Sequence, residues 1–172
     1  SSGREAMLRA ASRLLSLVYL LLAVELFDEL YSGVGPLSAA AIREGLELDY
    51  TGAAAVLLFV PTAIAMVVEP ALFLLADRYP RRWFVSGGLA VMALAAFGAA
   101  SATGPLTMTA AMTLAYLGSG SGVALAQATL VDAQPPDQPG AAERALARWA
   151  LLGELGDLLG PVLVGGLAAF SF

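Results

Sequence analysis

Acidic residues inside long apolar stretches are the side chains of this sequence best suited to chemistry. In the first apolar stretch, Glu25, Asp28 and Glu29 stand at positions i, i+3 and i+4, so a helix would collect them on one face. In the last stretch, Glu154 and Asp157 repeat the i, i+3 spacing. Clustered carboxyl groups titrate as a coupled set. We therefore expect these five residues to bind protons and to exchange them against a cationic ligand.

A sixth acid, Glu69, precedes Pro70 in the second apolar stretch, and no Arg or Lys accompanies any of the six acids at depth. A charged residue at the centre of a membrane-spanning helix costs roughly 2.5–3.5 kcal/mol on insertion scales. Such residues must face a water-filled cavity, bind a cation or be protonated. A structural role stays open as the alternative: Glu25 or Glu154 could hydrogen-bond to a neighbouring helix, and Glu69 could satisfy a backbone group that Pro70 frees.

The composition places these acids in a membrane protein. Apolar residues make up 59% of the chain and charged residues only 13%, whereas soluble domains average about 25% charged residues. Residues 83–131 carry no charge, which at about 20 residues per crossing is enough for two helices and a turn. The sequence therefore predicts an all-α polytopic membrane protein, with the lipid bilayer as its first partner.

Several classes of function are excluded by residues that the chain lacks. It has no Cys and no His, so it offers no thiol nucleophile, no thiolate metal site and no imidazole base. The net charge is −5 and there is no basic patch, which argues against nucleic-acid binding. Nothing supplies a nucleophile with an oxyanion donor set, so we expect no enzyme activity.

Apolar runs between Gly, Pro and charged residues predict five membrane-spanning helices. The first is expected to end at Gly35-Pro36, and the fourth to be interrupted by the glycines and serines of residues 118–122. The predicted helices are residues 14–35, 51–76, 83–100, 106–131 and 141–168, and the first turns of the last one are expected to lie outside the bilayer. This bundle, residues 14–172, follows a cytoplasmic segment, residues 1–13, whose first three residues resemble the remnant of an expression tag.

The arginines predict the orientation of the bundle, because short cytoplasmic segments hold the positive charge of a membrane protein. Only Arg43 falls on the opposite side of the predicted spans from all the others. The others are Arg4, Arg9, Arg13, Arg78, Arg81, Arg82, Arg144 and Arg148. The N-terminus is therefore expected in the cytoplasm, and five spans place Phe172 outside.

The segment after the second predicted helix resembles the loop-two signature of the major facilitator superfamily, G-x-x-x-D-R-x-G-R-R. Its acid and its three arginines match, whereas Phe73 and Pro80 stand where the signature has glycines. The matching residues are Asp77, Arg78, Arg81 and Arg82.

Two predicted helices carry further resemblances to this superfamily. In the fifth helix, the order of the small residues is similar to the antiporter signature, with one extra residue after the proline. These residues are Gly156, Gly160, Pro161, Gly165 and Gly166, which form a place where the helix can bend. Gly118 and Gly122 resemble the glycines of the fourth-helix motif, although its upstream arginine is absent.

Residues 25–78 are also similar to transporters of the fosmidomycin-resistance type. The similarity rests on the acids of the first helix, on Leu48-Asp49-Tyr50-Thr51 at the start of the second, and on Glu69-Pro70 ahead of Asp77-Arg78. Those proteins commonly have Gln before this proline, so Glu69 adds an ionisable site.

The superfamily resemblance implies a fold and an arrangement. The family is built from two six-helix halves, each made of three-helix inverted repeats. This chain would correspond to the first half without its sixth helix, and the second half would follow in cis or as a separate chain. The resemblance further implies that Glu25 and Asp157 lie near the substrate. Asp77 and the arginines that follow it would latch against the second half.

We therefore expect the N-terminal half of a proton-coupled secondary transporter in a bacterial cytoplasmic (inner) membrane. It would export a small cationic or zwitterionic molecule by alternating access, driven by the proton gradient and without a cofactor. One alternative is a divalent metal-ion transporter, with Glu25, Asp28 and Asp157 as hard carboxylate ligands. An alternative of another class is a membrane module for assembly or interaction that transports nothing.

Overall fold

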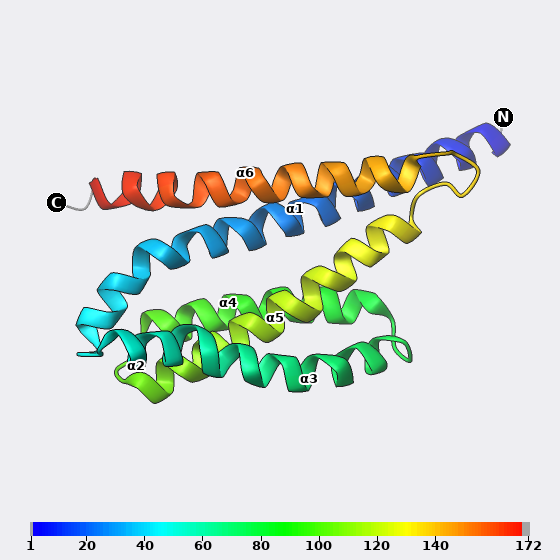
Figure 1. Ribbon diagram of the computed structural model, residues 1–172. Coiled ribbons are helices and arrows are strands. Elements are labelled where there is room, and N and C mark those ends of the chain that lie inside the picture. Colours follow the sequence, from blue (N-terminus) through cyan, green and yellow to red (C-terminus); the bar gives the residue numbers. More distant parts are fainter. Residues whose placement is uncertain (1, 170–172) are drawn as a thin grey trace.

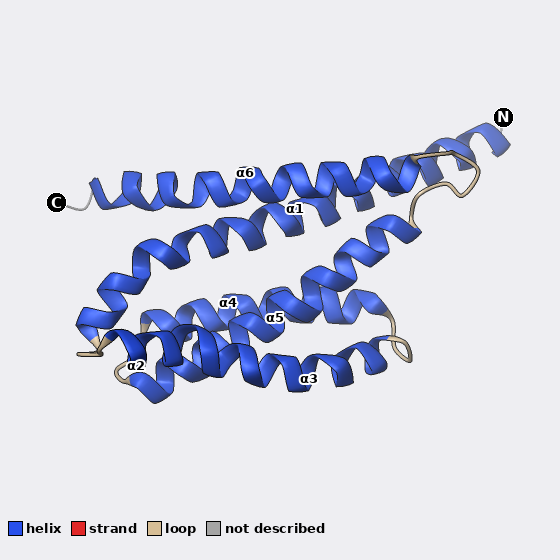
Figure 2. Cartoon of the chain, in the orientation of Figure 1, coloured by secondary structure: helices blue, strands red, loops and turns tan. Residues whose placement is uncertain are grey.

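The structure is a computed structural model that describes the backbone of residues 2–169, and the side chains of residues 12–35 and 38–166. The described chain is helical, without strands (Figure 2). Its elements are α1 (Ser2–Gly45), α2 (Tyr50–Ala54), the π-helical turn η1 (Ala55–Phe59), α3 (Val60–Ala76), α4 (Arg81–Ala100), α5 (Pro105–Asp132) and α6 (Ala141–Ala169). Residue 1 of the expected tag remnant and the C-terminal Phe172 lie outside the described residues.

Helix α1 is longer than the sequence predicts. It continues past Gly35 to Gly45, so the predicted end at Gly35-Pro36 is wrong. The Ser38 hydroxyl donates a hydrogen bond to the carbonyl oxygen of Val34 at 3.0 Å, a local contact that goes with bending of a helix. Figure 1 shows α1 bending in this part and continuing towards α2. The chain reverses only at Glu47, which adopts a left-handed backbone with φ of 53°.

Residues 50–76 form one continuous helical rod made of α2, η1 and α3. It begins at Asp49, whose carboxylate accepts a hydrogen bond from the backbone N–H of Gly52 at 2.6 Å and so caps the helix. The wide turn η1 ends at Phe59, two residues before Pro61. Proline lacks the N–H that a regular α-helix requires, and a π-turn accommodates such a break without ending the helix.

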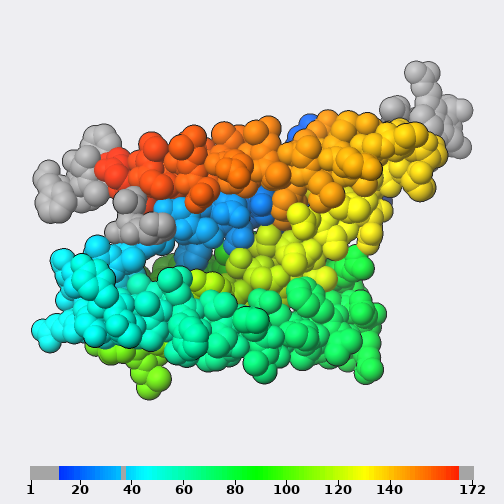
Figure 3. Space-filling view, in the orientation of Figure 1, coloured from blue at the N-terminus to red at the C-terminus, as the bar shows by residue number. Residues whose placement is uncertain are grey.

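The helices form two layers that α5 connects. Helices α1 and α6 lie side by side in one layer, and α3 and α4 pack on α5 in the other (Figures 1 and 3). Helix α5 also contacts α1 and α6. The buried core lies where these three meet and consists of Leu21, Leu22, Val24, Val123, Ala126, Leu130, Ala145 and Trp149.

Among the residues that the structure describes, three helices are long and apolar enough to cross a membrane, namely residues 50–76, 81–100 and 105–132. Large apolar side chains such as Phe59, Val67 and Phe97 are exposed on them, as expected for surfaces that face lipid. Helices α1 and α6 are not among the three. The apolar stretches of α1 and α6 are interrupted by acids, which lower the hydropathy of both helices. The candidate site lies at these acids.

Candidate functional site

Glycines bring α6 into close contact with α1. A Cβ atom added at Gly156 would lie 2.7 Å from the carbonyl oxygen of Leu26, and one added at Gly160 would lie 2.7 Å from that of Leu30. No side chain fits between backbones at this distance. The two helices are therefore held close together along the segment of α1 that carries its acids.

The three acids of α1 form a compact cluster, as their spacing predicts. Each of Glu25, Asp28 and Glu29 offers a carboxylate oxygen that lies within 4.8 Å of the other two. Glu25 is 7% exposed and Asp28 is 6% exposed, whereas Glu29 is half-buried. Ionised groups are rarely buried this deeply unless they are paired.

Asp28 is held by a residue that sequence reasoning missed. The hydroxyl of Ser119 in α5 donates a hydrogen bond to Asp28 Oδ2 at 3.1 Å. The other oxygen, Asp28 Oδ1, is buried and has no hydrogen-bond partner in the described part of the chain. Ser119 belongs to the Gly/Ser segment, residues 118–122, for which the sequence predicts only an interruption of the helix and a resemblance to a glycine motif. The position of Ser119 between Gly118 and Gly120 was the one sign in the sequence that a hydroxyl could reach a neighbouring helix.

Glu25 occupies space that a glycine of α6 leaves. A Cβ atom at Gly153 would lie 2.7 Å from Glu25 Oε1, so a larger residue at this position would displace the carboxylate. Trp149, one turn earlier in α6, lies beside the same carboxyl group. The buried end of the cluster is thus formed by α6 as well as by α1.

The two acids of α6 lie beside the cluster and do not join it. Glu154 and Asp157 are exposed, and with Asp28 they are charged neighbours of Glu29. The cluster of three carboxylates contains neither residue. The structure therefore brings together the predicted acids of α1 and places those of α6 at the border of the site.

Glu69 approaches the same part of α5 from α3. Its carboxyl group lies against Gly120, where any Cβ atom would collide with Oε1. Gly118 and Gly122 of α5 face Gly88 of α4. Residues 118–122 are thus where α1, α3 and α4 all meet α5, and α5 runs through them without the predicted interruption.

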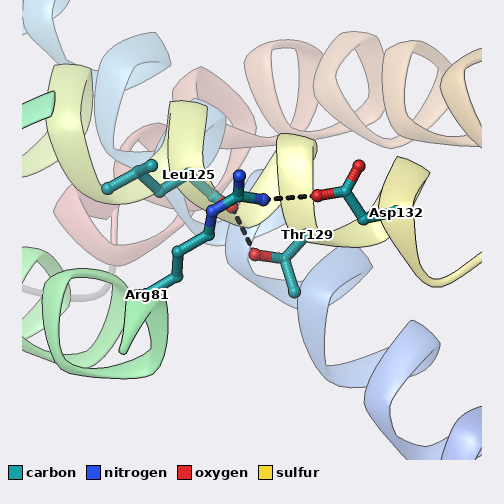
Figure 4. Close-up of polar contacts among 4 residues, drawn as sticks. All are labelled: Arg81, Leu125, Thr129 and Asp132. Atoms are coloured by element: carbon teal, nitrogen blue, oxygen red, sulfur yellow. Dashed lines mark hydrogen bonds and ion pairs between the residues drawn. The ribbon is translucent and has the colours of Figure 1, made fainter. Parts of the chain in front are cut away.

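The start of α4, directly after the loop that follows α3, is joined to the end of α5 by an ion pair. Arg81 Nη1 donates to Asp132 Oδ2 at 2.5 Å (Figure 4). One turn earlier in α5, the Thr129 hydroxyl donates to the carbonyl oxygen of Leu125 at 2.7 Å. Sequence reasoning gives Asp132 no role, so it missed this pair.

The other residues that match the loop-two signature lie on the surface. Asp77 follows the last turn of α3, and the side chains of Asp77, Arg78 and Arg82 are exposed. The guanidinium of Arg82 lies 5.6 Å from the ring centre of its neighbour Trp83. These groups are therefore accessible at the loop.

The predicted bending segment of α6 is helical throughout, including Pro161. Gly156 and Gly160 contact α1, whereas Gly165 and Gly166 have open space around them. The first part of this motif therefore packs against α1, and its last two glycines contact none of the other described helices.

Fold and site together define an all-α protein with three helices apolar enough to cross a membrane and a buried cluster of carboxylates beside them. A comparison with protein-family models, curated proteins and solved structures finds no match to this chain.

Proposed function

We propose that this chain is the N-terminal bundle of a proton-coupled secondary transporter of the major facilitator type. It would exchange protons for a small cationic or zwitterionic molecule, as an exporter in a bacterial inner membrane. The observation that carries the proposal is the buried cluster of Glu25, Asp28 and Glu29, to which the helices bring no basic residue. Residues 14–42, α5 and α6 beyond Arg148 contain neither Arg nor Lys.

Packing supports five membrane spans rather than three. Helices α1 and α6 both contact α5, which is apolar enough to cross a membrane. Both also expose large apolar side chains, among them Leu20 and Phe27 on α1 and Leu158 and Leu163 on α6. Such surfaces are suited to lipid. In this arrangement the arginines near the start of α1, after α3 and at the start of α6 share the cytoplasmic side.

The helix contacts also fit an inverted repeat. In the superfamily, the first three spans of a half correspond to the last three with opposite topology. A contact between spans one and five then corresponds to a contact between spans four and two. In this chain, α1 and α6 are the first and fifth spans, and they are in contact. The fourth and second spans, α5 and α3, are also in contact.

An assembly module that transports nothing would be expected to satisfy its buried acids with protein contacts. Asp28 Oδ1 has no such contact among the described residues. A buried carboxylate oxygen without a partner is costly, and acids at membrane depth are typical of ion and proton pathways. This favours a transporter over a purely structural bundle.

We assign a gating role to Asp77 and the arginines that follow it, at the loop after α3. The Arg81–Asp132 pair would fix this loop to the end of α5, while the exposed Asp77 stays accessible to the second half of the transporter. Removing the charge of Asp77 should impair conformational exchange and leave substrate binding largely intact.

Proton coupling can be tested in membrane vesicles that contain the complete transporter. A pH-sensitive dye reports proton movement when a cationic substrate is added. We expect the double substitution Glu25→Gln and Asp157→Asn to abolish substrate-dependent proton movement, whereas Glu44→Gln, an exposed acid outside the predicted spans, should leave it unchanged. Normal proton movement in the double variant would contradict the proposal.

A further inference from the structure

We propose that Glu25, Asp28 and Glu29, with Asp28 positioned by Ser119, form a site for one hard divalent cation of the Ca²⁺ class. The inference goes beyond the proposed function, which names protons and a small cationic or zwitterionic molecule, because it assigns a divalent ion to the same acidic cluster.

The spacing of the carboxylates fits a single ion. Oxygen ligands lie 2.3–2.6 Å from Ca²⁺, so two ligands of one ion are at most about 5 Å apart. The three carboxylate oxygens all lie within 4.8 Å of one another, which meets this limit. Mg²⁺ requires oxygens at about 2.0–2.1 Å in near-ideal octahedral geometry, so we expect the larger ion to bind more tightly.

The unpartnered oxygen of Asp28 is the second observation that indicates a ligand. Asp28 is 6% exposed, and its Oδ1 has no hydrogen-bond partner in the described structure. A buried carboxylate oxygen retains strong acceptor capacity, and a cation is the partner that best satisfies it. Ser119 binds Oδ2 and so fixes the orientation of the carboxylate, as partners of metal ligands commonly do.

The charge of the surroundings favours a divalent ion. Glu154 and Asp157 lie near Glu29, so five acids gather where the helices supply no Arg or Lys. Like charges that share a site in a low dielectric repel one another strongly. An ion of charge +2 held by three carboxylates relieves this repulsion more than a single proton does.

The ligand set differs from the one that the sequence indicates for a metal. Sequence reasoning combined Glu25 and Asp28 with Asp157. In the structure Asp157 is exposed and outside the cluster, and Glu29 completes it. Asp157 would then affect binding only through its charge.

The test is Ca²⁺ binding to the full chain purified in detergent, measured by equilibrium dialysis with radioactive Ca²⁺. We expect saturable binding of one ion per chain. Asp28→Asn and Ser119→Ala should each weaken the affinity at least about tenfold, the usual effect of losing a ligand or its orienting partner. Glu44→Gln is the control, because Glu44 is an exposed acid outside the cluster and outside the predicted spans, and this variant should bind Ca²⁺ normally.

Circular dichroism and size-exclusion chromatography establish that each variant is folded. Ser119→Ala keeps the test decisive if Asp28→Asn does not fold. Absence of saturable binding to the folded chain would overturn the inference, as would equal affinities of Ser119→Ala, Glu44→Gln and the unaltered chain.

The outcomes separate this inference from the proposed function. If Ca²⁺ does not bind but the vesicle experiment shows proton coupling that depends on Glu25 and Asp157, the transporter proposal stands and the divalent site is wrong. If Ca²⁺ binds but proton movement is unaffected by those substitutions, the site stands and the proposed coupling is wrong.

Discussion

Two helix pairs of this protein, α1 with α6 and α4 with α5, come together through glycines but differ in charge. In the α4–α5 pair, a Cβ atom at Gly88 would lie 2.7 Å from the carbonyl oxygen of Gly118. In the α1–α6 pair, one at Gly33 would lie 2.7 Å from the carbonyl oxygen of Asp157. The charged residues of the α4–α5 pair are confined to its ends, whereas the α1–α6 pair carries five acids far from its ends, namely Glu25, Asp28, Glu29, Glu154 and Asp157.

This difference shows that close helix packing in this protein needs no acidic residues. Small residues that let backbones approach are sufficient for the contact between α4 and α5. The acids of α1 and α6 therefore add a cost that packing does not require. A ligand that binds them is the reason we infer for their presence.

The largest effect on stability should come from filling the α4–α5 contact. In Gly88→Leu, the new side chain would meet the backbone of Gly118 and Gly122, which cannot move aside as a flexible side chain can. We expect the free energy of unfolding to fall by about 3 kcal/mol, the upper part of the range for overpacking. Thermal unfolding in detergent, followed by circular dichroism, measures this loss.

The neighbouring Gly87 provides the matched control. A side chain added at this position would enter open space, so Gly87→Leu should leave stability unchanged or raise it slightly, because glycine is a weak helix former. Equal losses for the two substitutions would contradict the packing that the structure shows for α4 and α5.

An intermediate effect of opposite sign is expected in the α1–α6 pair. Glu25→Gln keeps the size of the side chain and removes one of the clustered charges. Removing one of three clustered like charges relieves their mutual repulsion, so we expect a gain of about 1 kcal/mol, the equivalent of roughly one pKa unit, together with weaker cation binding. Unfolding measured without added divalent ions checks the first part, and a clear loss of stability would indicate that Glu25 has a structural role.

The smallest effect is expected at the Arg81–Asp132 ion pair, which lies outside both glycine contacts. Its side chains are 40% and 65% exposed, and exposed ion pairs contribute about 0–1 kcal/mol. A double-mutant cycle with Arg81→Gln and Asp132→Asn should therefore give a coupling energy below about 1 kcal/mol. A larger coupling would show that the pair stabilises the bundle in addition to any role in gating.

Local sequence patterns predict the helices of this protein well, because apolar runs and breaking residues act locally. Residues 81–100 and 105–132 are helical, almost as predicted. The three acids of α1 form a cluster, as their spacing predicts. The Gly35-Pro36 boundary fails because such residues weaken a helix without necessarily ending it once it packs against others.

The parts of the site that depend on contacts between helices could not be predicted. Ser119 meets Asp28 across 91 positions of sequence, and Arg81 meets Asp132 across 51. The i, i+3 spacing places Glu154 and Asp157 on one face of α6, but it does not determine whether this face is directed towards α1. The structure leaves both acids exposed, between the glycines that contact α1 and the apolar face of α6.

The central claim is that the acids of α1 and α6 bind protons or a cation. It requires that Glu154 and Asp157, beside the cluster of α1, face water and not lipid. The chain contains no cysteine, so single cysteines can be introduced as unique labels in membranes. Glu154→Cys and Asp157→Cys test the acidic edge of α6, and Leu155→Cys and Leu159→Cys test its exposed apolar face.

The decisive measurement is the rate at which a charged, water-soluble thiol reagent modifies each of these four variants in intact membranes. The account predicts rapid modification at positions 154 and 157 and little at positions 155 and 159. Equal rates at all four positions, or protection of 154 and 157, would contradict it.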